Sequence, residues 1–481
     1  MPERFDVIVI GCGVAGLSAS LEAAQNRAQV CVLDLGSEKN SNSFYAQGGI
    51  AAAMGKKDSW KKHYNDTINA GVGLCNERIV EMATKMAPKA IQALIDEGLE
   101  FDGGEKPDLG LEGGHSEHRA LHINGDETGR GITEFLKKRC REEGVNFFEN
   151  SLVHKIILAQ KRFAGVQINA KSQTEPFFAK SLVIAGGGYA AAFEKTTNPK
   201  TTLGASIGVA ASAGCSLRGM EFVQFHPTTL EAGIGGNYLV TESVRGEGGI
   251  IVNAKGKAIV DPLFTRDKVS RAIYSEISSG GKAFLDAREF KTGFFKERFP
   301  TVHKELAAKR INPETDLIPI ETAAHYTIGG IAANEEAKTN LAGIFACGEA
   351  SNLGLHGANR LACNSLLEGL VFGKIAGKNA AKQKKATKTP KDTQKYVEKN
   401  GSETRVVFDA LKKVMWRCAG VVRNEAGLKD GLAGILHMEK RIEQTRENEN
   451  VLARNALIVA RHTFEAALAR KKSVGTHYRE N

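Results

Sequence analysis

Apolar runs separated by glycine-rich turns predict an α/β fold at the start of the chain. Residues 5–10 are rich in valine and isoleucine, residues 17–26 form an alanine-rich amphipathic stretch, and residues 30–33 are again apolar. This order predicts strand, helix and strand. Two later apolar runs, residues 182–185 and 343–347, also end in glycines. We expect them to be further strands of the same sheet.

The turn after the first strand has the spacing Gly-x-Gly-x-x-Gly, with an acidic residue after the second strand. Gly11 allows the turn, Gly13 lets the backbone approach a pyrophosphate, and Gly16 lets the helix pack on the strand. The helix N-terminus supplies amide donors for phosphates, and Asp34 is placed for a ribose hydroxyl. The pattern leaves FAD and NAD open, although no second fingerprint indicates a separate nicotinamide domain. The expected cofactor residues here are Gly11, Gly13, Val14, Ala15, Gly16 and Asp34.

The rest of the chain divides into segments that differ in composition and residue pattern. Residues 222–320 differ from the flanking α/β pattern, lysines gather around 383–390, and three amphipathic patterns cover 403–419, 425–444 and 451–470. These three patterns predict a helical bundle. The predicted domains are a discontinuous nucleotide-binding domain over 1–221 and 321–380, an insertion over 222–320, a linker over 381–400, and a bundle over 401–481.

Composition excludes several classes of protein. The 481 residues are 42% hydrophobic and 25% charged, and no window reaches the ~18 uncharged apolar residues of a membrane span. The N-terminus lacks the basic and apolar regions of a signal peptide. The eight cysteines are scattered without a Cys-x-x-Cys pair, so we expect neither a metal site nor disulfides. A cytoplasmic protein without a membrane partner is the expectation.

The net charge of +10 is concentrated at one end. Residues 371–481 contain 24 Lys and Arg against 12 Asp and Glu, a surplus of +12, whereas residues 1–370 carry −2. A basic tail admits a second hypothesis, an FAD-bearing RNA-modifying protein that grips tRNA. The tail has few aromatic residues for base stacking, and its charges alternate with an apolar helical period. We therefore expect a solvated helical surface and no nucleic-acid partner.

Five polar clusters flanked by glycines carry the candidate chemistry. They lie at residues 221–228, 241–249, 265–267, 325–330 and 355–368. Singly, each has an ordinary structural explanation, such as a loop histidine or a surface ion pair. Together they resemble the flavoprotein family of succinate dehydrogenase, fumarate reductase and L-aspartate oxidase, most closely its aspartate-oxidising members, from Phe5 to the C-terminus.

The resemblance implies a fold and a reaction. The fold is an α/β, Rossmann-like FAD-binding domain interrupted by an α+β capping domain and followed by a C-terminal helical bundle. The reaction is FAD-dependent oxidation of L-aspartate to iminoaspartate, with O2 or fumarate as acceptor, as the first step of NAD biosynthesis. It also implies possible product transfer to quinolinate synthase. The alternative is a soluble fumarate reductase or succinate-oxidising flavoprotein.

The resemblance also implies roles for the polar clusters. Arg360, His226, His325 and Thr241 would hold the substrate carboxylates, since arginine pairs a carboxylate in a bidentate fork. Arg266 would be the proton-handling residue, with Glu242 and Arg245 as its relay, and Gln224 would contact substrate. Glu112, in a loop where succinate dehydrogenases have no carboxylate, would receive the ammonium; a surface loop acid is the alternative. The expected catalytic residues are Arg266, Glu242, Arg245, His226, His325 and Arg360.

By the same resemblance, the flavin is not covalently attached. Asn42 stands where membrane-bound succinate dehydrogenases have the histidine that bonds to FAD. Three departures from the family pattern are notable: Ala205 replaces a polar cofactor contact, Cys363 replaces serine beside the flavin, and Val474 replaces an arginine near the C-terminus. We expect thinner contacts there between bundle and core than in longer relatives. The remaining cofactor residues are Ser43, Tyr45, Ala46, Gln47, Gly48, Gly49, Glu349, Asn364, Ser365 and Leu366.

Overall fold

A five-stranded parallel sheet forms the centre of the computed structural model, which describes residues 3–36, 39, 41–104, 106–170, 173–231, 238–384, 402–444 and 451–480. In spatial order its strands are β19 (Ile344–Ala346), β11 (Ser181–Ile184), β2 (Val7–Ile10), β3 (Val30–Leu33) and β7 (Asn146–Phe148). The two later strands predicted from the apolar runs are confirmed, because β11 pairs with β2 and β19 pairs with β11. The residues of β2, β3, β11 and β19 are all buried, as expected when both faces of a parallel sheet are covered.

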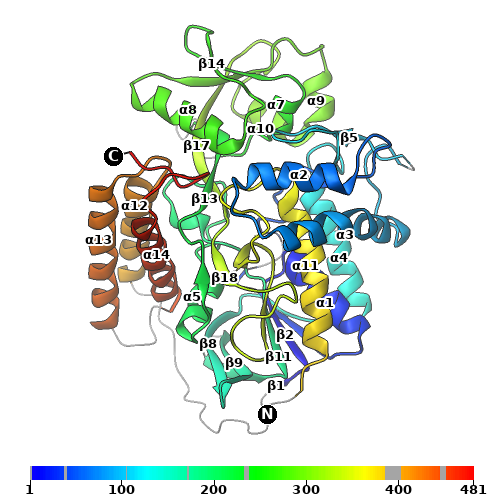
Figure 1. Cartoon of the computed structure of the whole chain (residues 1–481), viewed down its shortest axis with the longest axis vertical. Coiled ribbons are helices and arrows are strands. Elements are labelled where there is room, and N and C mark those ends of the chain that lie inside the picture. Colours follow the sequence, from blue (N-terminus) through cyan, green and yellow to red (C-terminus); the bar gives the residue numbers. More distant parts are fainter. Residues whose placement is uncertain are drawn as a thin grey trace.

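Two helices far apart in sequence pack together over this sheet (Figure 1). Helix α1 (Val14–Gln25) follows the glycine turn, and α11 (Asn364–Ala381) returns from the far end of the domain. Gly373 and Gly377 of α11 lie against the backbone of Ala15 and Ala19, where an added Cβ would collide. The close approach holds the start of α1 rigidly. Helices α2 (Trp60–Ala70), α3 (Glu77–Asp96) and α4 (Thr128–Glu142) lie on the same side of the molecule.

Three smaller sheets complete this domain. Strands β8 (Leu152–Ala159), β9 (Arg162–Ala170) and β10 (Gln173–Phe178) form an antiparallel meander, which β1 (Glu3–Arg4) extends in parallel. The predicted elements did not include this meander. Two three-stranded sheets join distant segments: β4 (Ile50–Ala51), β6 (Ala120–Leu121) and β5 (Leu109–Gly110), and β12 (Leu217–Arg218), β18 (Gly330–Ala332) and β20 (Ser351–Asn352).

The insertion folds around an apolar core of its own. Its sheet runs β13 (Val223–Leu230), β17 (Ile318–Thr327), β16 (Ala283–Asp286), β14 (Ile250–Asn253) and β15 (Ala258–Val260). Its helices are α7 (Ser243–Gly246), α8 (Arg266–Ser278), α9 (Phe294–Arg298) and α10 (Pro300–Ala308). In Figure 1 it stands above the rest of the molecule, reached through β13 and β17. The predicted boundary between residues 320 and 321 falls inside β17, which serves both parts, and the domain limits stay predictions.

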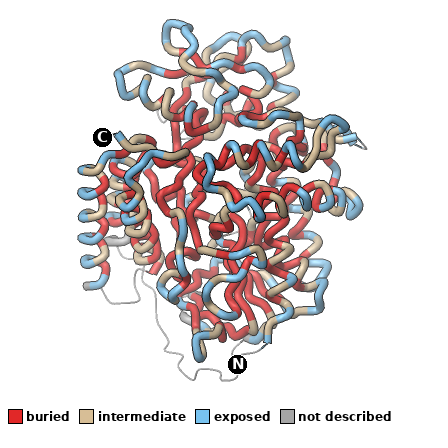
Figure 2. Tube along the Cα trace, viewed as in Figure 1, coloured by how far each residue is buried: buried red, intermediate tan, exposed pale blue. Residues whose placement is uncertain are grey.

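The C-terminal helices α12 (Ser402–Ala419), α13 (Glu425–Gln444) and α14 (Val451–Ala469) confirm the three helical patterns to within a residue. In α14, Leu457 and Phe464 are fully buried. Helix α14 packs on α5 (Ala205–Ser212), where Gly208 approaches the backbone of Asn455. The predicted linker lies outside the described residues from 385 to 400. Figure 2 shows the bundle buried on its inner side and exposed on its outer side.

Val474, which stands in place of the arginine of the family pattern, contacts the core of the molecule. Val474 packs on a cluster formed by Phe222, Tyr326, Ile328 and Ala358. The neighbouring Thr476 donates from its amide and its hydroxyl to the carbonyl of Ala358, at 3.0 Å in each case. Apolar packing and hydrogen bonds to a backbone carbonyl thus hold this segment to the core, while the comparison with longer relatives stays a prediction. None of the described helices is long and apolar enough to cross a membrane.

Candidate active site

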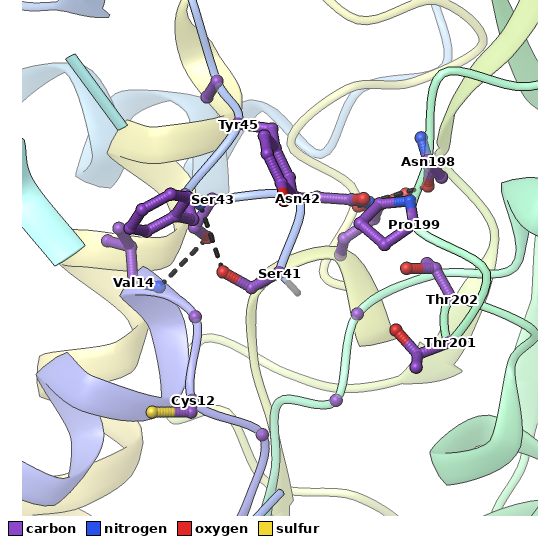
Figure 3. A pocket seen from close by; sticks show the side chains of 18 of the residues that line it. Cys12, Val14, Ser41, Asn42, Ser43, Tyr45, Asn198, Pro199, Thr201 and Thr202 are labelled. Atoms are coloured by element: carbon purple, nitrogen blue, oxygen red, sulfur yellow. Dashed lines mark hydrogen bonds between the residues drawn. The ribbon is translucent and has the colours of Figure 1, made fainter. Parts of the chain in front are cut away.

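A cavity of about 960 Å³ opens at the carboxyl ends of β2 and β3, beside the N-terminus of α1. Figure 3 shows its two sides, with Cys12 and Val14 facing the Ser41–Tyr45 loop, and the Asn198–Thr202 loop across from them. The Val14 amide donates to Ser43 Oγ at 3.0 Å. The edge where parallel strands end, next to a helix N-terminus, is the usual position of a dinucleotide pyrophosphate.

The glycines of the fingerprint have steric reasons to be glycines. Gly11 has φ +103°, and a Cβ there would collide with the backbone of Ala185. A Cβ on Gly13 would lie 2.8 Å from Ser43 Oγ, and one on Gly16 would strike the carbonyl of Gly11. These three positions keep the turn tight and its amides open to the cavity.

Most of the predicted cofactor residues line this cavity. They are Gly11, Gly13, Val14, Ala15, Asp34, Ser43, Tyr45, Ala46, Gln47, Glu349, Ser365 and Leu366. Gly16, Gly48, Gly49 and Asn364 are not among its lining residues. The Asn364 carboxamide is instead engaged by His63 Nε2 at 2.8 Å and by Thr67 Oγ1 at 3.0 Å.

Asp34 and Asn42 are fixed by neighbours at the cavity wall. Asp34 accepts from the Cys12 amide at 3.1 Å, and burial raises the pKa of its carboxyl despite this hydrogen bond. Asn42 donates to Asn198 Oδ1 at 2.7 Å and to Glu349 Oε2 at 2.9 Å. A carboxamide is not a nucleophile, so this position offers no group for a covalent flavin link.

The residues present fit FAD. The cavity combines a glycine cradle, helix amides and the carboxylate of Asp34, which suit a pyrophosphate and a ribose. Ser206, at the first turn of α5, also lines the cavity, and its buried hydroxyl has no hydrogen-bond partner in the described structure. Ala205 lies beside it at the cavity wall. Ser206 therefore offers a polar atom where Ala205 provides none.

A buried ionic cluster lies next to this cavity, at the junction with the insertion. Glu242 pairs with Arg245 at 2.9 Å and with Arg266 through Nε and Oε2. Burial opposes ionisation of Glu242, but Arg245 and Arg266 outweigh it and lower its pKa to about 2. Gln224 Oε1 accepts from Arg266 at 3.2 Å, while its amide donates to the Arg360 carbonyl at 2.8 Å. These bonds join the start of α8 to the loop that carries Arg360.

Arg360 is the cation without a counter-ion in this cluster. Its side chain is buried, lies 4.4 Å from the centroid of the Tyr326 ring, and donates to Ser365 Oγ at 3.1 Å. No ion pair to a carboxylate is recorded for it among the described residues, and its Nε has no partner. Burial and the charge of Arg266 lower its pKa to about 10. A buried unpaired guanidinium is costly unless an anion completes it.

His226 and His325 lie face to edge, with ring centroids 4.9 Å apart. Burial and the nearby Arg266 lower the pKa of both well below the usual range, so both rings are neutral at neutral pH. His226 Nδ1 accepts from the Thr228 amide at 3.2 Å, which leaves the proton on Nε2. His325 Nδ1 is 2.8 Å from Thr197 Oγ1, and His325 lines the cavity.

Glu112 lies on another side of the cluster and is 2% exposed, so the surface-loop alternative is wrong. Its Oε1 accepts from Ser243 Oγ, and Ser243 Oγ is 3.3 Å from Thr241 Oγ1. Its Oε2 is buried without a partner in the described structure. Burial raises the pKa of the adjacent Cys363 thiol, and both Glu112 and Arg360 lie close enough to influence it. A buried anion and a buried cation thus face one small region.

Three residues that support the site were given no role from the sequence. Asn359 accepts from Gln224 Nε2 at 2.9 Å, Tyr326 supports Arg360, and Thr197 holds His325. Asn359 belongs to a predicted cluster, and Thr197 stands in a Thr-Thr-Asn-Pro turn that signals a polar loop. Tyr326 also belongs to a predicted cluster, 325–330, but was given no role, because a tyrosine inside a strand is commonly a core residue.

A glycine cradle beneath an inserted domain, joined to a buried ionic cluster, is the architecture of an FAD-dependent oxidoreductase. The model described as "FAD binding domain" matches residues 6–366, and the one described as "Fumarate reductase flavoprotein C-term" matches residues 408–481. The chain belongs to this flavoprotein family, and within it to the family of the L-aspartate oxidases. The predicted family and fold class are thereby confirmed.

The relatives match along nearly their whole length. L-aspartate oxidase of Pyrococcus abyssi is 37% identical over 477 residues, covering 99% of this chain and 95% of the relative. That of Pyrococcus horikoshii is 38% identical over 474 residues, covering 98% and 95%. Among solved structures, a quinol fumarate reductase of E. coli superposes with a TM-score of 0.89 at 27% identity, covering 100% of this chain and 92% of that one.

Proposed function

We propose that the chain oxidises L-aspartate to iminoaspartate with FAD as its cofactor. Bound FAD supplies a two-electron acceptor for the hydride that leaves the substrate α-carbon. The observation that carries the proposal is the pair of incomplete buried charges: the guanidinium of Arg360 and the carboxylate of Glu112 each have an atom without a partner in the described structure. Aspartate has both of the groups that would complete them.

The cationic side of the site would bind the carboxylates. Arg360 offers a planar fork, and His226 offers a proton on Nε2. His325 and Thr241 add neutral donors whose own positions are held by Thr197 and Ser243. A charge-assisted contact in a buried site gains strength because water is excluded. The insertion, which carries Thr241, would exclude water by lying over the cavity.

The anionic side would select the amino group. Glu112 Oε2 is buried and free to accept from an ammonium, whereas succinate and fumarate have no cation to offer it. Arg266 would act mainly as an electrostatic clamp in aspartate oxidation, held by Glu242 and Gln224. In reduction of fumarate it would deliver a proton, with Glu242 and Arg245 returning one to it.

Oxygen or fumarate would reoxidise the enzyme, and the fumarate reductase fold supports the second acceptor. We propose that the reaction is the first step of NAD biosynthesis. Since an imine hydrolyses in water, we further propose that quinolinate synthase receives the product. All eight cysteines are free thiols, which supports a reducing, cytoplasmic location.

The test is stoichiometric. Purified holoenzyme should consume one aspartate per hydrogen peroxide in air, and one aspartate per succinate formed from fumarate without oxygen. Turnover of succinate in place of aspartate would overturn the proposed function in favour of a succinate-oxidising flavoprotein.

A further inference from the structure

His122 is a buried histidine that no predicted role includes. It is 3% exposed and follows β6 directly, whereas Glu112 follows the neighbouring strand β5 by two residues. The two strands pair antiparallel, with Gly110 opposite Ala120. In this antiparallel register the chain leaves the two strands at opposite ends, so the side chains bring the two residues together: the His122 ring lies over Gly110, and its Nε2 comes within 3.8 Å of Glu112 Oε1.

The space for the His122 ring is created by two glycines. A Cβ on Gly110 would lie 2.7 Å from His122 Cε1, and a Cβ on Gly49 would lie 3.1 Å from His122 Nε2. Gly49 belongs to the loop that supplies cavity residues Ser43 to Gln47. Nε2 therefore lies at the side of the ring next to the flavin-binding loop, in a slot that any larger residue would fill.

His122 Nε2 and Glu112 are an incomplete pair. Nε2 is buried and has no hydrogen-bond partner in the described structure, and it lies 3.8 Å from Glu112 Oε1. That distance is slightly beyond a hydrogen bond, and such contacts commonly tighten when substrate binds. Arg119, which immediately precedes β6, is already paired with Asp58 at 2.8 Å and with Asp66. Glu112 is thus the carboxylate within ion-pair distance of His122 among the described residues.

We propose that His122 is the terminal proton acceptor for the substrate ammonium, reached through Glu112. The inference rests on the proposed function and names how the site deprotonates aspartate. Oxidation at the α-carbon requires the amino nitrogen to have a lone pair, so the ammonium must lose a proton first. A buried carboxylate alone would hold that proton beside the nitrogen, whereas an imidazole with an unpartnered Nε2 can take it further.

An N–H bond of the ammonium breaks and its proton goes to the carboxylate of Glu112, which becomes a neutral carboxylic acid. The same proton then passes from Glu112 to His122 Nε2, giving an imidazolium and restoring the ionised carboxylate. The Cα–H bond then breaks and its two electrons leave with the hydrogen toward the flavin. The nitrogen lone pair becomes the new C=N bond, so the product leaves as an iminium. Fumarate has no amino group and does not need this route.

The test separates the two half-reactions in the holoenzyme. In His122→Asn, anaerobic rapid mixing should show that reduction of the flavin by aspartate slows at least ~100-fold. Reoxidation of the reduced flavin by fumarate should stay within a factor of ~3, and so should the aspartate KM, because Arg360 and Glu112 remain. The matched control His118→Asn changes an exposed histidine of the loop that precedes β6, and it should leave both half-reactions unchanged.

Two results would overturn the inference. Aspartate reduction within a factor of ~3 of the unaltered enzyme would show that His122 takes no proton. An equal fall of both half-reactions would show that the residue is structural only. If the unaltered holoenzyme is not reduced by aspartate at all, the proposed function itself fails, which is a different outcome from normal reduction in the variant.

Discussion

Glu242 and Arg266, 24 residues apart in sequence, form a buried ion pair at the junction between the insertion and the cofactor cavity. The second oxygen of Glu242 pairs with Arg245 at 2.9 Å. One carboxylate thus balances two guanidinium groups, and the third, Arg360, has no counter-ion among the described residues. The cluster is short of negative charge, which is the condition for binding a dicarboxylate.

Removing the Glu242 charge should be strongly destabilising. Glu242→Gln leaves Arg245 and Arg266 buried without a counter-charge, and breaking such a pair costs about 3–5 kcal/mol. Equilibrium unfolding in urea measures this loss. In the control Glu247→Gln, the affected pair with Arg298 is partly exposed, and we expect a cost below about 1 kcal/mol. Equal stability changes in the two variants would contradict this interpretation.

Arg360→Met should separate stability from activity. Burial lowers the pKa of this arginine to about 10, so its charge opposes folding when no substrate is bound. We expect the substrate-free holoenzyme to gain about 1–3 kcal/mol of stability while aspartate turnover falls at least ~100-fold. The exposed control Arg288→Met, which breaks a surface pair with Asp286, should change stability by less than about 0.5 kcal/mol. A destabilised Arg360→Met would count against an unpaired charge.

Glu112→Gln should alter substrate choice. The carboxamide keeps the shape of the side chain but no longer offers a charge to an ammonium. Aspartate oxidation should fall at least ~100-fold, and fumarate reduction should remain within a factor of ~3. Steady-state rates for both substrates measure the difference. The control is Glu117→Gln, which changes an acid of the same loop as Glu112 that pairs with Lys62 at the surface. A parallel loss of both activities would contradict a role in amino-group recognition.

Acid should destabilise the protein through its buried histidines. Burial and the nearby His115 lower the pKa of His63 to about 3, whereas the unfolded chain binds this proton near pH 6.5. The contribution of His63 to stability is thus present above pH 6.5 and is lost as pH falls toward 3. Within this range, His63 should lower the free energy of unfolding by about 1.4 kcal/mol for each unit by which the pH falls.

Replacing His63 by Gln should flatten this dependence by the same amount. Urea unfolding at pH 6 and pH 4.5 checks the slope. His118→Gln, at an exposed position, should leave the slope unchanged. An identical slope for unaltered enzyme and His63→Gln would show that His63 does not remain neutral in the folded protein.

Much of the fold was predictable from local sequence patterns. The glycine fingerprint, the strands at 182–185 and 343–347, and the three C-terminal helices were predictable, because each depends on apolar periodicity or turn chemistry within a short window. The antiparallel meander from Leu152 to Phe178 was not, although each of its strands pairs with the next along the chain, because polar residues such as Lys155 and Gln167 interrupt its apolar runs.

The residues of the site were likewise predictable only where they stand in a recognisable local motif. Arg266, Glu242 and Arg360 stand in polar, glycine-flanked motifs that signal chemistry. His122 does not, because its environment comes from Gly49 and Gly110 on neighbouring strands. The assignment of Asn364 to the cofactor rested on resemblance alone, and in the structure its carboxamide bonds to His63 and Thr67. Such long-range pairings cannot be read from one segment of sequence.

The most direct test of aspartate oxidation is anaerobic titration of the purified holoenzyme, followed by the visible absorbance of its flavin. L-aspartate should bleach the flavin completely, and succinate at the same concentration should leave it oxidised. Both compounds offer two carboxylates to the cationic side of the site, but only aspartate also offers a cation to Glu112. Bleaching by succinate without bleaching by aspartate would contradict the proposed reaction.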